Sequence, residues 1–325
     1  MKIILFWSTF NDSNIEVNEW VNSTAKLSPF HFLSLKSHEK FGNEVELYTY
    51  QKIDNKNIPQ NIVIKNADNI FPAKYAHNAL MRGHSIAHIS DGVRLKVASR
   101  INGGIPLDMD AVVLNPFPKA ENVGWFATSP AKVLGGVAYK WGKAHPPLTV
   151  HDNSWDGKAV NMFPIIVNNK IKAEVEKLAN NIFATLASDP VKNSKGWNYV
   201  MRALGEMIKV DRDLITCQPI VFCPIPGWLP SGTCYSLEAP TRLDGNTKAY
   251  GYLLPSINEI LKNSITVQHC FESVYRFTNK PDLPKGFWLT VKEGSLVSKE
   301  AEFVLGTNWK IILNNLEIAQ AHGKS

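Results

Sequence analysis

The spacing of hydrophobic residues in the first fifty residues changes from that of a strand to that of a helix and back to that of a strand. An apolar run at residues 3–7 predicts a buried strand. In "LSPFHFLSLKSHEKFG", Phe32, Leu35 and Phe41 recur at near-helical spacing, and Gly42 suits the end of a helix. The run "EVELYTY" then predicts a second strand. Strand, helix, glycine and strand begin a βαβ unit, which predicts a parallel sheet that binds ligands at the carboxyl ends of its strands.

A second stretch with helical period covers residues 75–100 and stops at Asn102-Gly103-Gly104. The apolar run "IPLDMDAVVL" follows and predicts a strand over residues 105–114. Asp108 and Asp110 interrupt this run. Two neighbouring carboxylates in a poorly solvated place repel each other, so we expect a bound cation to offset their charges.

The rest of the chain predicts further strands and helices. Strands are predicted at "GWFATSP", "LGGVAY", "PIIVNN" and "CQPIVFCPIP", a polar loop reaches residue 157, and helices are predicted over residues 170–188 and 196–209. Past residue 276 the pattern is shorter and less regular, and it ends in an amphipathic piece at residues 308–319. We therefore expect an α/β domain over residues 1–276 and a C-terminal extension or acceptor-side subdomain over residues 277–325.

The composition indicates a folded chain with a buried core and no membrane span. Of 325 residues, 44% are hydrophobic, but no apolar stretch approaches the roughly 20 residues that cross a bilayer. The four cysteines match neither a zinc pattern nor a disulfide framework, and no secretory cleavage site follows the start. We therefore expect a cytoplasmic protein. The formal net charge is +6, yet no block of basic residues indicates a nucleic-acid-binding tail.

The spacing of Asp108 and Asp110 alone identifies no chemistry, because Asp211 and Asp213 repeat it in "VDRDLI". That second pair lies at a polar junction after a predicted helix, where solvated carboxylates need no ligand. The first pair fits two kinds of enzyme. One is the haloacid-dehalogenase phosphatases, whose motif "DMDAVVL" imitates and whose first aspartate is a nucleophile. Against them, the chain lacks a later G-D-x-x-x-D to complete the magnesium site.

A longer block favours the second kind. Residues 90–117, "SDGVRLKVASRINGGIPLDMDAVVLNPF", resemble the S-D-x-x-R, helix, G-G-x-x-x-D-x-D, apolar, x-P-F block of one group of GT-A glycosyltransferases. The group includes yeast-type initiating mannosyltransferases, bacterial D-x-D sugar transferases and the glucosylating clostridial toxins. "ILFW", "LSLKSHEKFGNEVELYTY" and "KNADNIFP" also resemble its segments. The resemblance is good over residues 1–118, and it implies a Rossmann-like mixed sheet flanked by helices that binds a nucleotide sugar.

The resemblance also implies roles for four residues. It implies transfer of a hexose from a UDP- or GDP-sugar to a hydroxyl of a glycan or other acceptor, with retention of configuration and with Mn²⁺ or Mg²⁺. Asp108 and Asp110 would serve the metal and the diphosphate, Asp110 more directly. Asp91 and Arg94 would lie at the donor sugar, where a carboxylate binds hydroxyls and a guanidinium forks onto hydroxyl or phosphate oxygens.

Further residues match the group less specifically. Trp7 resembles the aromatic side chain that stacks on the donor base, although a Trp that ends a first strand is as often part of the core. His269, in "SITVQHC", resembles a late histidine on the metal side. Asn161 and Asn198 fall where these enzymes place polar residues for donor or acceptor. Pro106 stands in place of the group's aromatic residue, in the pocket wall on which donor identity depends.

Two other functions stay open. A phage-type DNA glycosyltransferase would use the same donor site with a flipped, hydroxymethylated base as acceptor, and an isoelectric point near 9.0 suits an anionic partner. A non-catalytic protein would bind the sugar nucleotide without turnover. The intact set of Asp91, Arg94, Asp108 and Asp110 argues against that loss of activity.

Overall fold

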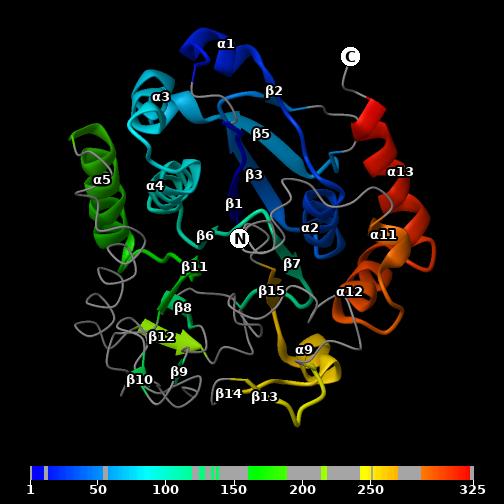
Figure 1. Cartoon of the computed structure of the whole chain (residues 1–325). Coiled ribbons are helices and arrows are strands. Elements are labelled where there is room, and N and C mark those ends of the chain that lie inside the picture. Colours follow the sequence, from blue (N-terminus) through cyan, green and yellow to red (C-terminus); the bar gives the residue numbers. More distant parts are fainter. Residues whose placement is uncertain are drawn as a thin grey trace.

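The chain forms an α/β fold, as the sequence predicts (Figure 1). The computed structural model describes residues 2–10, 14–53, 58–118, 124–128, 133–134, 137–138, 160–188, 214–217, 242–249, 252–269 and 287–322. The strands are β1 (Lys2–Phe6), β2 (Thr24–Ala25), β3 (Glu44–Thr49), β4 (Lys52–Ile53), β5 (Ile62–Asn66), β6 (Gly104–Pro106), β7 (Ala111–Val113), β8 (Gly124–Thr128), β9 (Val133–Leu134), β10 (Val137–Ala138), β11 (Val160–Ile166), β12 (Leu214–Cys217), β13 (Lys248–Ala249), β14 (Tyr252–Leu253) and β15 (Thr266–Gln268). The helices are α1 (Val17–Asn22), α2 (Pro29–Lys40), the 3₁₀ helix η2 (Ala67–Asn69), α3 (Ala73–Met81), α4 (Ile86–Ala98), α5 (Lys172–Ser188), α9 (Ile257–Asn263), α11 (Phe287–Thr290), α12 (Leu296–Leu305) and α13 (Trp309–His322).

Four parallel strands form the central sheet in the order β5-β3-β1-β6. The chain therefore begins inside the sheet, with β1 between β3 and β6. Beyond β6, an antiparallel bridge joins Gly104 to Val167, just after β11, and the Val167 N–H donates to the Gly104 carbonyl at 2.9 Å. This arrangement confirms the expected class, a mixed sheet flanked by helices.

Strand β1 is buried on both faces of the sheet. Ile4 and Phe6 pack in the core cluster beneath α3, α4 and α5, whereas Ile3 and Leu5 pack in the cluster that contains Leu35 of α2. Alternating side chains point to opposite faces, so a strand that is apolar at every position needs a helical layer on each side. Figure 1 shows α4 and α5 on one side of the sheet and α2 on the other.

Helix α2 begins and ends close to the positions that the sequence predicts. The Ser28 hydroxyl accepts a hydrogen bond from the His31 N–H, and the Ser28 N–H donates to the His31 ring, so the helix start is capped in both directions. Pro29 occupies the first turn, where no helical N–H is needed. Gly42, with φ of 62°, follows the end in a conformation that strains other residues.

The single helix predicted over residues 75–100 is wrong, because the segment forms two helices. Helix α3 ends at Met81 and α4 begins at Ile86. Between them, Gly83 has φ of 90°, and the Ser85 hydroxyl accepts from the Ala87 N–H at 3.0 Å as the cap of α4. Both helices bury apolar residues in the same cluster, so the hydrophobic period alone does not reveal the break.

The strand predicted over residues 105–114 also divides in two. Strand β6 lies in the central sheet beside β1, whereas β7 leaves that sheet and pairs antiparallel with β15. The turn between β6 and β7 carries Asp108 and Asp110. The two charges therefore interrupt the apolar run because the chain changes sheets there.

Helix α2 covers the edge of β7 that faces away from β15. The Ser34 hydroxyl donates to the Ala111 carbonyl at 2.5 Å, and the Val113 N–H donates to the Ser37 hydroxyl at 2.9 Å. These two serines give the outward backbone groups of a short strand the partners that burial requires. Strand β7 is thereby fixed between α2 and β15, and the turn before it is fixed as well.

The remaining predicted strands and helices are confirmed in part. The strand predicted at "GWFATSP" and the helix predicted over residues 170–188 are confirmed as β8 and α5, and the strand near "PIIVNN" is β11, which begins earlier. "LGGVAY" overlaps the paired strands β9 and β10, and β12 ends at Cys217, where the strand at "CQPIVFCPIP" was expected to begin. The helix predicted over residues 196–209, the end of the loop at residue 157 and the boundary at residue 276 lie outside the described residues.

Residues 287–322 form helices α11, α12 and α13, which pack on α2. Trp288, Leu296 and Leu313 share one core cluster with Phe30 and Leu33 of α2. Figure 1 shows these helices along the outer side of α2. The described part of the C-terminal segment therefore shares a core with one of the first helices of the chain.

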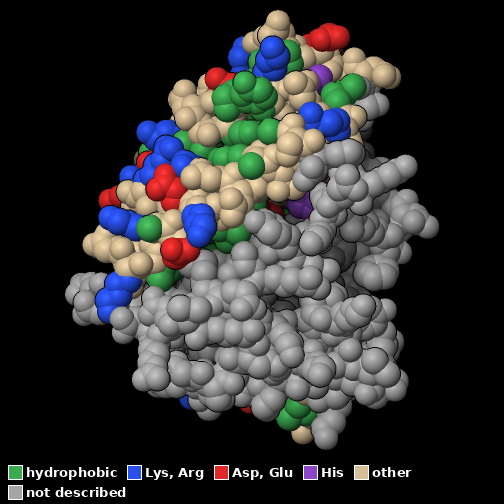
Figure 2. Space-filling view, turned by 90° about the vertical axis from the view of Figure 1, so that its left-hand side faces the viewer, with side chains coloured by type: hydrophobic (Ala, Val, Ile, Leu, Met, Phe, Trp, Pro, Cys, Tyr) green, Lys and Arg blue, Asp and Glu red, His purple; other side chains and the backbone are tan. Residues whose placement is uncertain are grey.

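The surface carries both signs of charge. On the side of the molecule that α5 occupies, the described Lys and Arg side chains are interspersed with Asp and Glu (Figure 2). Lys96 of α4, for example, contacts Glu176 of α5 at 2.6 Å. No helix within the described ranges is long and apolar enough to cross a membrane.

Gly92, where α4 packs against α5, should not tolerate a methyl group. A Cβ there would lie 2.5 Å from Cε1 of Phe183, and the Phe183 ring is stacked on Phe71 with centroids 4.5 Å apart. We expect Gly92→Ala to lower the free energy of unfolding in urea by about 1–3 kcal/mol. In a Phe183→Leu background the cost should fall below about 1 kcal/mol, and an equal cost in both backgrounds would contradict the packing explanation.

Candidate functional site

The turn that carries the aspartates begins where β6 stops pairing with β1. The Leu107 N–H donates to the Ile4 carbonyl at 3.0 Å, and Asp108 follows directly. Trp7 stands at the corresponding end of β1, where its N–H donates to the Tyr48 carbonyl of β3 at 2.9 Å. Asp108 and Trp7 thus lie at the carboxyl edge of the parallel strands, which is where open α/β sheets bind ligands.

Arg94 joins two carboxylates at this edge. Its Nη2 donates to Oδ1 of Asp91 at 2.9 Å, and its Nη1 donates to Oδ1 of Asp108 at 2.5 Å. Its Nε donates to the Ser90 carbonyl at 3.3 Å. Asp91 and Arg94 are one turn apart on α4, so the helix brings them together, and the turn after β6 supplies Asp108. The structure therefore assembles three of the predicted site residues into one network.

Exposure rises through this network from the inside outwards. The side chains of Asp91 and Arg94 are 1% and 3% exposed, whereas that of Asp108 is 27% exposed. Asp108 is therefore the most accessible of the three side chains. Asp91 lies behind Arg94 and holds its guanidinium, while the sugar contact implied for Asp91 and Arg94 stays a prediction.

Burial decides the charge of Asp91. Removal from water raises the pKa of its carboxyl to about 8; the Arg94 guanidinium opposes this rise, and the Asp108 charge adds to it. Two carboxylates share one guanidinium, so a proton on Asp91 leaves the network neutral. The buried charges then balance at neutral pH.

Gln268 completes the set around Asp108, and sequence reasoning missed it. Its side-chain Nε2 donates to Oδ2 of Asp108, so both oxygens of that carboxylate have partners. Gln268 is the last residue of β15, which pairs with β7 just beyond the turn. The available signal was its place directly before His269 at the end of a predicted strand.

Asp110 is held through its backbone. Its carbonyl accepts a hydrogen bond from the His269 N–H at 3.1 Å, next to the ladder between β7 and β15. Consecutive residues of one strand end therefore hold both aspartates, Gln268 by its side chain and His269 by its backbone. The sequence places Asp110 and His269 about 160 positions apart, and the antiparallel pairing brings them together.

The His269 ring enters the core. Its Nε2 lies 2.8 Å from Oε2 of Glu300 on α12, and the ring packs edge-on against Phe30 with centroids 4.9 Å apart. Burial raises the pKa of the Glu300 carboxyl, and His269 opposes that rise. The described residues contain no group of three His, Cys, Asp or Glu side chains that could hold a metal, so Asp108, Asp110 and His269 are not gathered into a three-ligand site.

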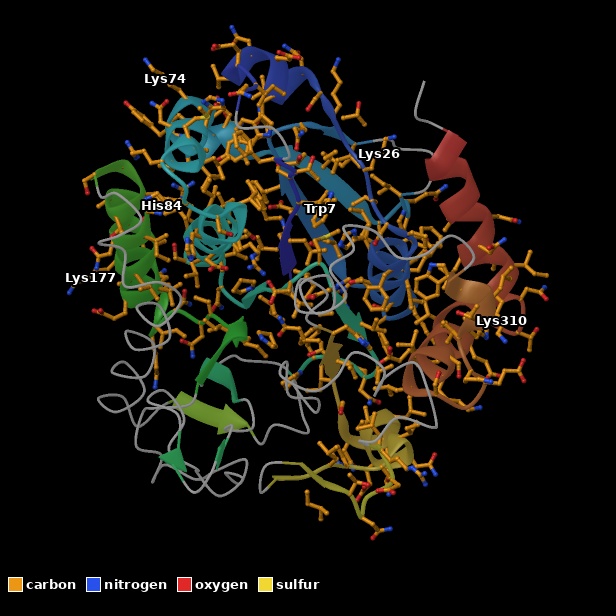
Figure 3. The ribbon with its side chains drawn as sticks, in the orientation of Figure 1. Trp7, Lys26, Lys74, His84, Lys177 and Lys310 are labelled. Atoms are coloured by element: carbon orange, nitrogen blue, oxygen red, sulfur yellow. The ribbon has the colours of Figure 1, made fainter. Side chains whose placement is uncertain are left out.

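Trp7 is half-buried and packed against α2. Its ring centroid lies 4.0 Å from that of His31, and its Nε1 donates to the Lys26 carbonyl at 3.1 Å. Figure 3 shows Trp7 among the central strands with Lys26 close by, whereas the labelled Lys74, Lys177 and Lys310 lie on the outer helices. Its predicted role under a nucleotide base stays a prediction.

Three predicted features fall outside the described side chains. Asn198 and the second aspartate pair, Asp211 and Asp213, lie outside the described residues. Asn161 lies in β11, but its side chain is not among those described. Their predicted roles stay predictions.

Replacement of Asp91 by asparagine should flatten the pH dependence of stability. Folding moves the pKa of this carboxyl from 3.8 to about 8, so between these values the folded protein keeps a proton that the unfolded chain releases. The stability from this group is full below pH 4 and decreases as the pH rises toward 8. We expect the melting temperature to fall more steeply from pH 5 to pH 8 in the parent than in Asp91→Asn.

The control is Asp244→Asn. Backbone hydrogen bonds lower the pKa of that exposed carboxyl, so its protonation changes the stability only at pH values below this range. Parallel curves for the parent and Asp91→Asn would contradict the assignment of the proton to Asp91.

Comparisons with known proteins show a distant likeness among solved structures. No protein-family model matches the chain, and no curated protein matches its sequence. The chain is similar to a solved structure titled "PaToxG Glycosyltransferase", with 12% identity and a TM-score of 0.33, over 97% of this chain and 86% of that chain. An overlap this low carries no functional argument.

Proposed function

We propose that this protein is a glycosyltransferase that moves a hexose from a nucleotide sugar to an acceptor hydroxyl, with retention of anomeric configuration. The observation that supports it is the buried network of Asp91, Arg94 and Asp108 at the carboxyl edge of the sheet. The same three residues belong to the ordered block "SDGVR…LDMD" that resembles the GT-A group. The sequence order of this block and the contact of Arg94 with Asp108 both favour a donor site.

The network suits an anionic donor whose charge is offset by a cation. Asp108 and Asp110 are the residues that would hold Mn²⁺ or Mg²⁺, because carboxylates are hard ligands and such ions often take only one or two of them beside substrate phosphates. Both oxygens of Asp108 are hydrogen-bonded, so Asp110 is the more direct ligand in this proposal. A bound cation would stabilise the charge on the leaving nucleoside diphosphate.

The transfer needs little covalent help from the protein. The bond between the anomeric carbon and the diphosphate oxygen breaks, and a bond from that carbon to the acceptor oxygen forms. The acceptor proton goes to the leaving diphosphate, and we assign no side chain as catalytic base. Arg94 orients Asp108 toward the donor, because its guanidinium donates to that carboxylate, and the implied contact of Asp91 and Arg94 with the donor sugar is kept in this proposal.

The same contacts disfavour the phosphatase alternative. A nucleophilic carboxylate must turn an oxygen toward phosphorus in line, and hydrogen bonds to both oxygens fix its orientation and lower its nucleophilicity. In Asp108, the first residue of the pair, Arg94 engages Oδ1 and Gln268 engages Oδ2. An orienting or charge-bearing role fits this carboxylate better than nucleophilic attack.

Asp110→Asn should weaken metal-dependent donor binding by at least about tenfold, the effect of roughly 1.4 kcal/mol. The measurement is a thermal-shift series with UDP- and GDP-sugars, with and without Mn²⁺. A donor at 100 times its Kd stabilises the folded state by about 2.7 kcal/mol, so the true donor gives a clear shift in the parent. The variant should keep the fold and lose the Mn²⁺-dependent part of that shift.

Asp213→Asn, in the second D-x-D pair, is the spacing-matched control and should bind like the parent. A parent that responds to no nucleotide sugar would contradict the transferase proposal. A parent that binds a donor but neither hydrolyses nor transfers it would instead be the non-catalytic binding protein.

An anionic acceptor is the second candidate, favoured by the isoelectric point near 9.0. If the acceptor is hydroxymethylated DNA, gel shifts should show binding that weakens steeply between 50 mM and 200 mM salt. A saccharide acceptor predicts no DNA binding at either concentration. Plain DNA of the same sequence separates base recognition from general attraction to phosphate.

A further inference from the structure

Glu300 is a carboxylate in an apolar core. It lies on α12 with a side chain that is 0% exposed, among the residues of the cluster that joins α2 to the C-terminal helices. Its Oε1 has no hydrogen-bond partner among the residues that the structure describes. An ionisable side chain is costly to place there, because burial removes its hydration. Helix propensity does not require a Glu at this position, since other good helix formers would pack better.

The contact that accounts for Glu300 is the His269 ring. Oε2 lies 2.8 Å from Nε2, and both side chains are at most 1% exposed. Phe30 of α2 packs against the same ring. A buried polar pair of this kind adds little net stability, but it fixes one arrangement of the elements that carry it.

The element that carries His269 also holds both aspartates. Gln268 donates to the Asp108 carboxylate, and the His269 N–H donates to the Asp110 carbonyl. A displacement of the end of β15 would therefore move two hydrogen bonds at once. Glu300 is thus connected to the aspartate turn through its contact with the His269 ring and through the backbone of His269.

We infer that Glu300 is a positioning residue that fixes the end of β15 through the His269 ring and so sets the geometry of Asp108 and Asp110. The consequence for donor binding rests on the proposed function. Through this contact the C-terminal helix α12 helps to set the geometry of the donor site.

The test compares Glu300→Gln, which keeps size and hydrogen-bonding ability, with Glu300→Leu, which keeps volume only. Glu302→Leu on the exposed side of the same helix is the matched control. The first readout is the hydrogen exchange of the His269 amide in the protein without ligand. We expect exchange at least about tenfold faster in Glu300→Leu and unchanged in Glu300→Gln and in the control.

The second readout is donor affinity at saturating Mn²⁺. Glu300→Leu should weaken it about tenfold, or roughly 1.4 kcal/mol, and Glu300→Gln should restore it to within about threefold of the parent. If Glu300→Leu does not fold, the double variant His269→Leu with Glu300→Leu replaces the pair by apolar side chains, an exchange that often keeps stability. That variant should fold, and it should show both the faster exchange of the residue 269 amide and the weaker donor affinity.

Parent-like exchange at residue 269 in a folded leucine variant would overturn the inference while leaving the glycosyltransferase proposal intact. If no nucleotide sugar binds the parent, the exchange readout still decides the positioning role.

Discussion

A guanidinium stays protonated at any pH that a folded protein survives, so the buried charge of Arg94 must be balanced inside the molecule. Asp108 balances it from the turn after β6, and Asp91, on the same helix, accepts a hydrogen bond from the other terminal nitrogen. Loss of the Asp108 carboxylate would leave the desolvated guanidinium without its counter-charge, which is far more costly than loss of a surface ion pair. Helix α4 is therefore tied by charge to the point where the chain leaves the central sheet.

The other side of that turn is held by segments from the far end of the chain. Strand β15 supplies Gln268 and the backbone of His269, and α12 supplies Glu300. The N-terminal sheet and α4 thus present the aspartates, while C-terminal elements limit how these residues can move. A site built in this way depends on contacts of high sequence separation, whose loop-closure entropy tends to slow folding.

Local patterns account for what the sequence predicted correctly. The βαβ beginning follows from periodicity, and the proximity of Asp91 to Arg94 follows from their spacing on a helix. The break at Gly83 was missed because apolar positions on both sides face one core. Gln268 and Glu300 were missed because no local rule connects them to Asp108: one depends on the pairing of β15 with β7, the other on the packing of α12 on α2. Long-range pairing is the information that a single sequence does not display.

Strand β7 has left the protection of the central sheet, and a strand in that position can recruit a strand from another molecule along its open edge. Many proteins prevent this with lysine, proline or a bulge at the edge. Here the hydroxyls of Ser34 and Ser37, both fully buried, hydrogen-bond to the backbone groups of β7 with which an added strand would pair. The risk of intermolecular strand addition is therefore confined to states in which α2 has detached, and the stability of that one helix sets the resistance of this region to aggregation.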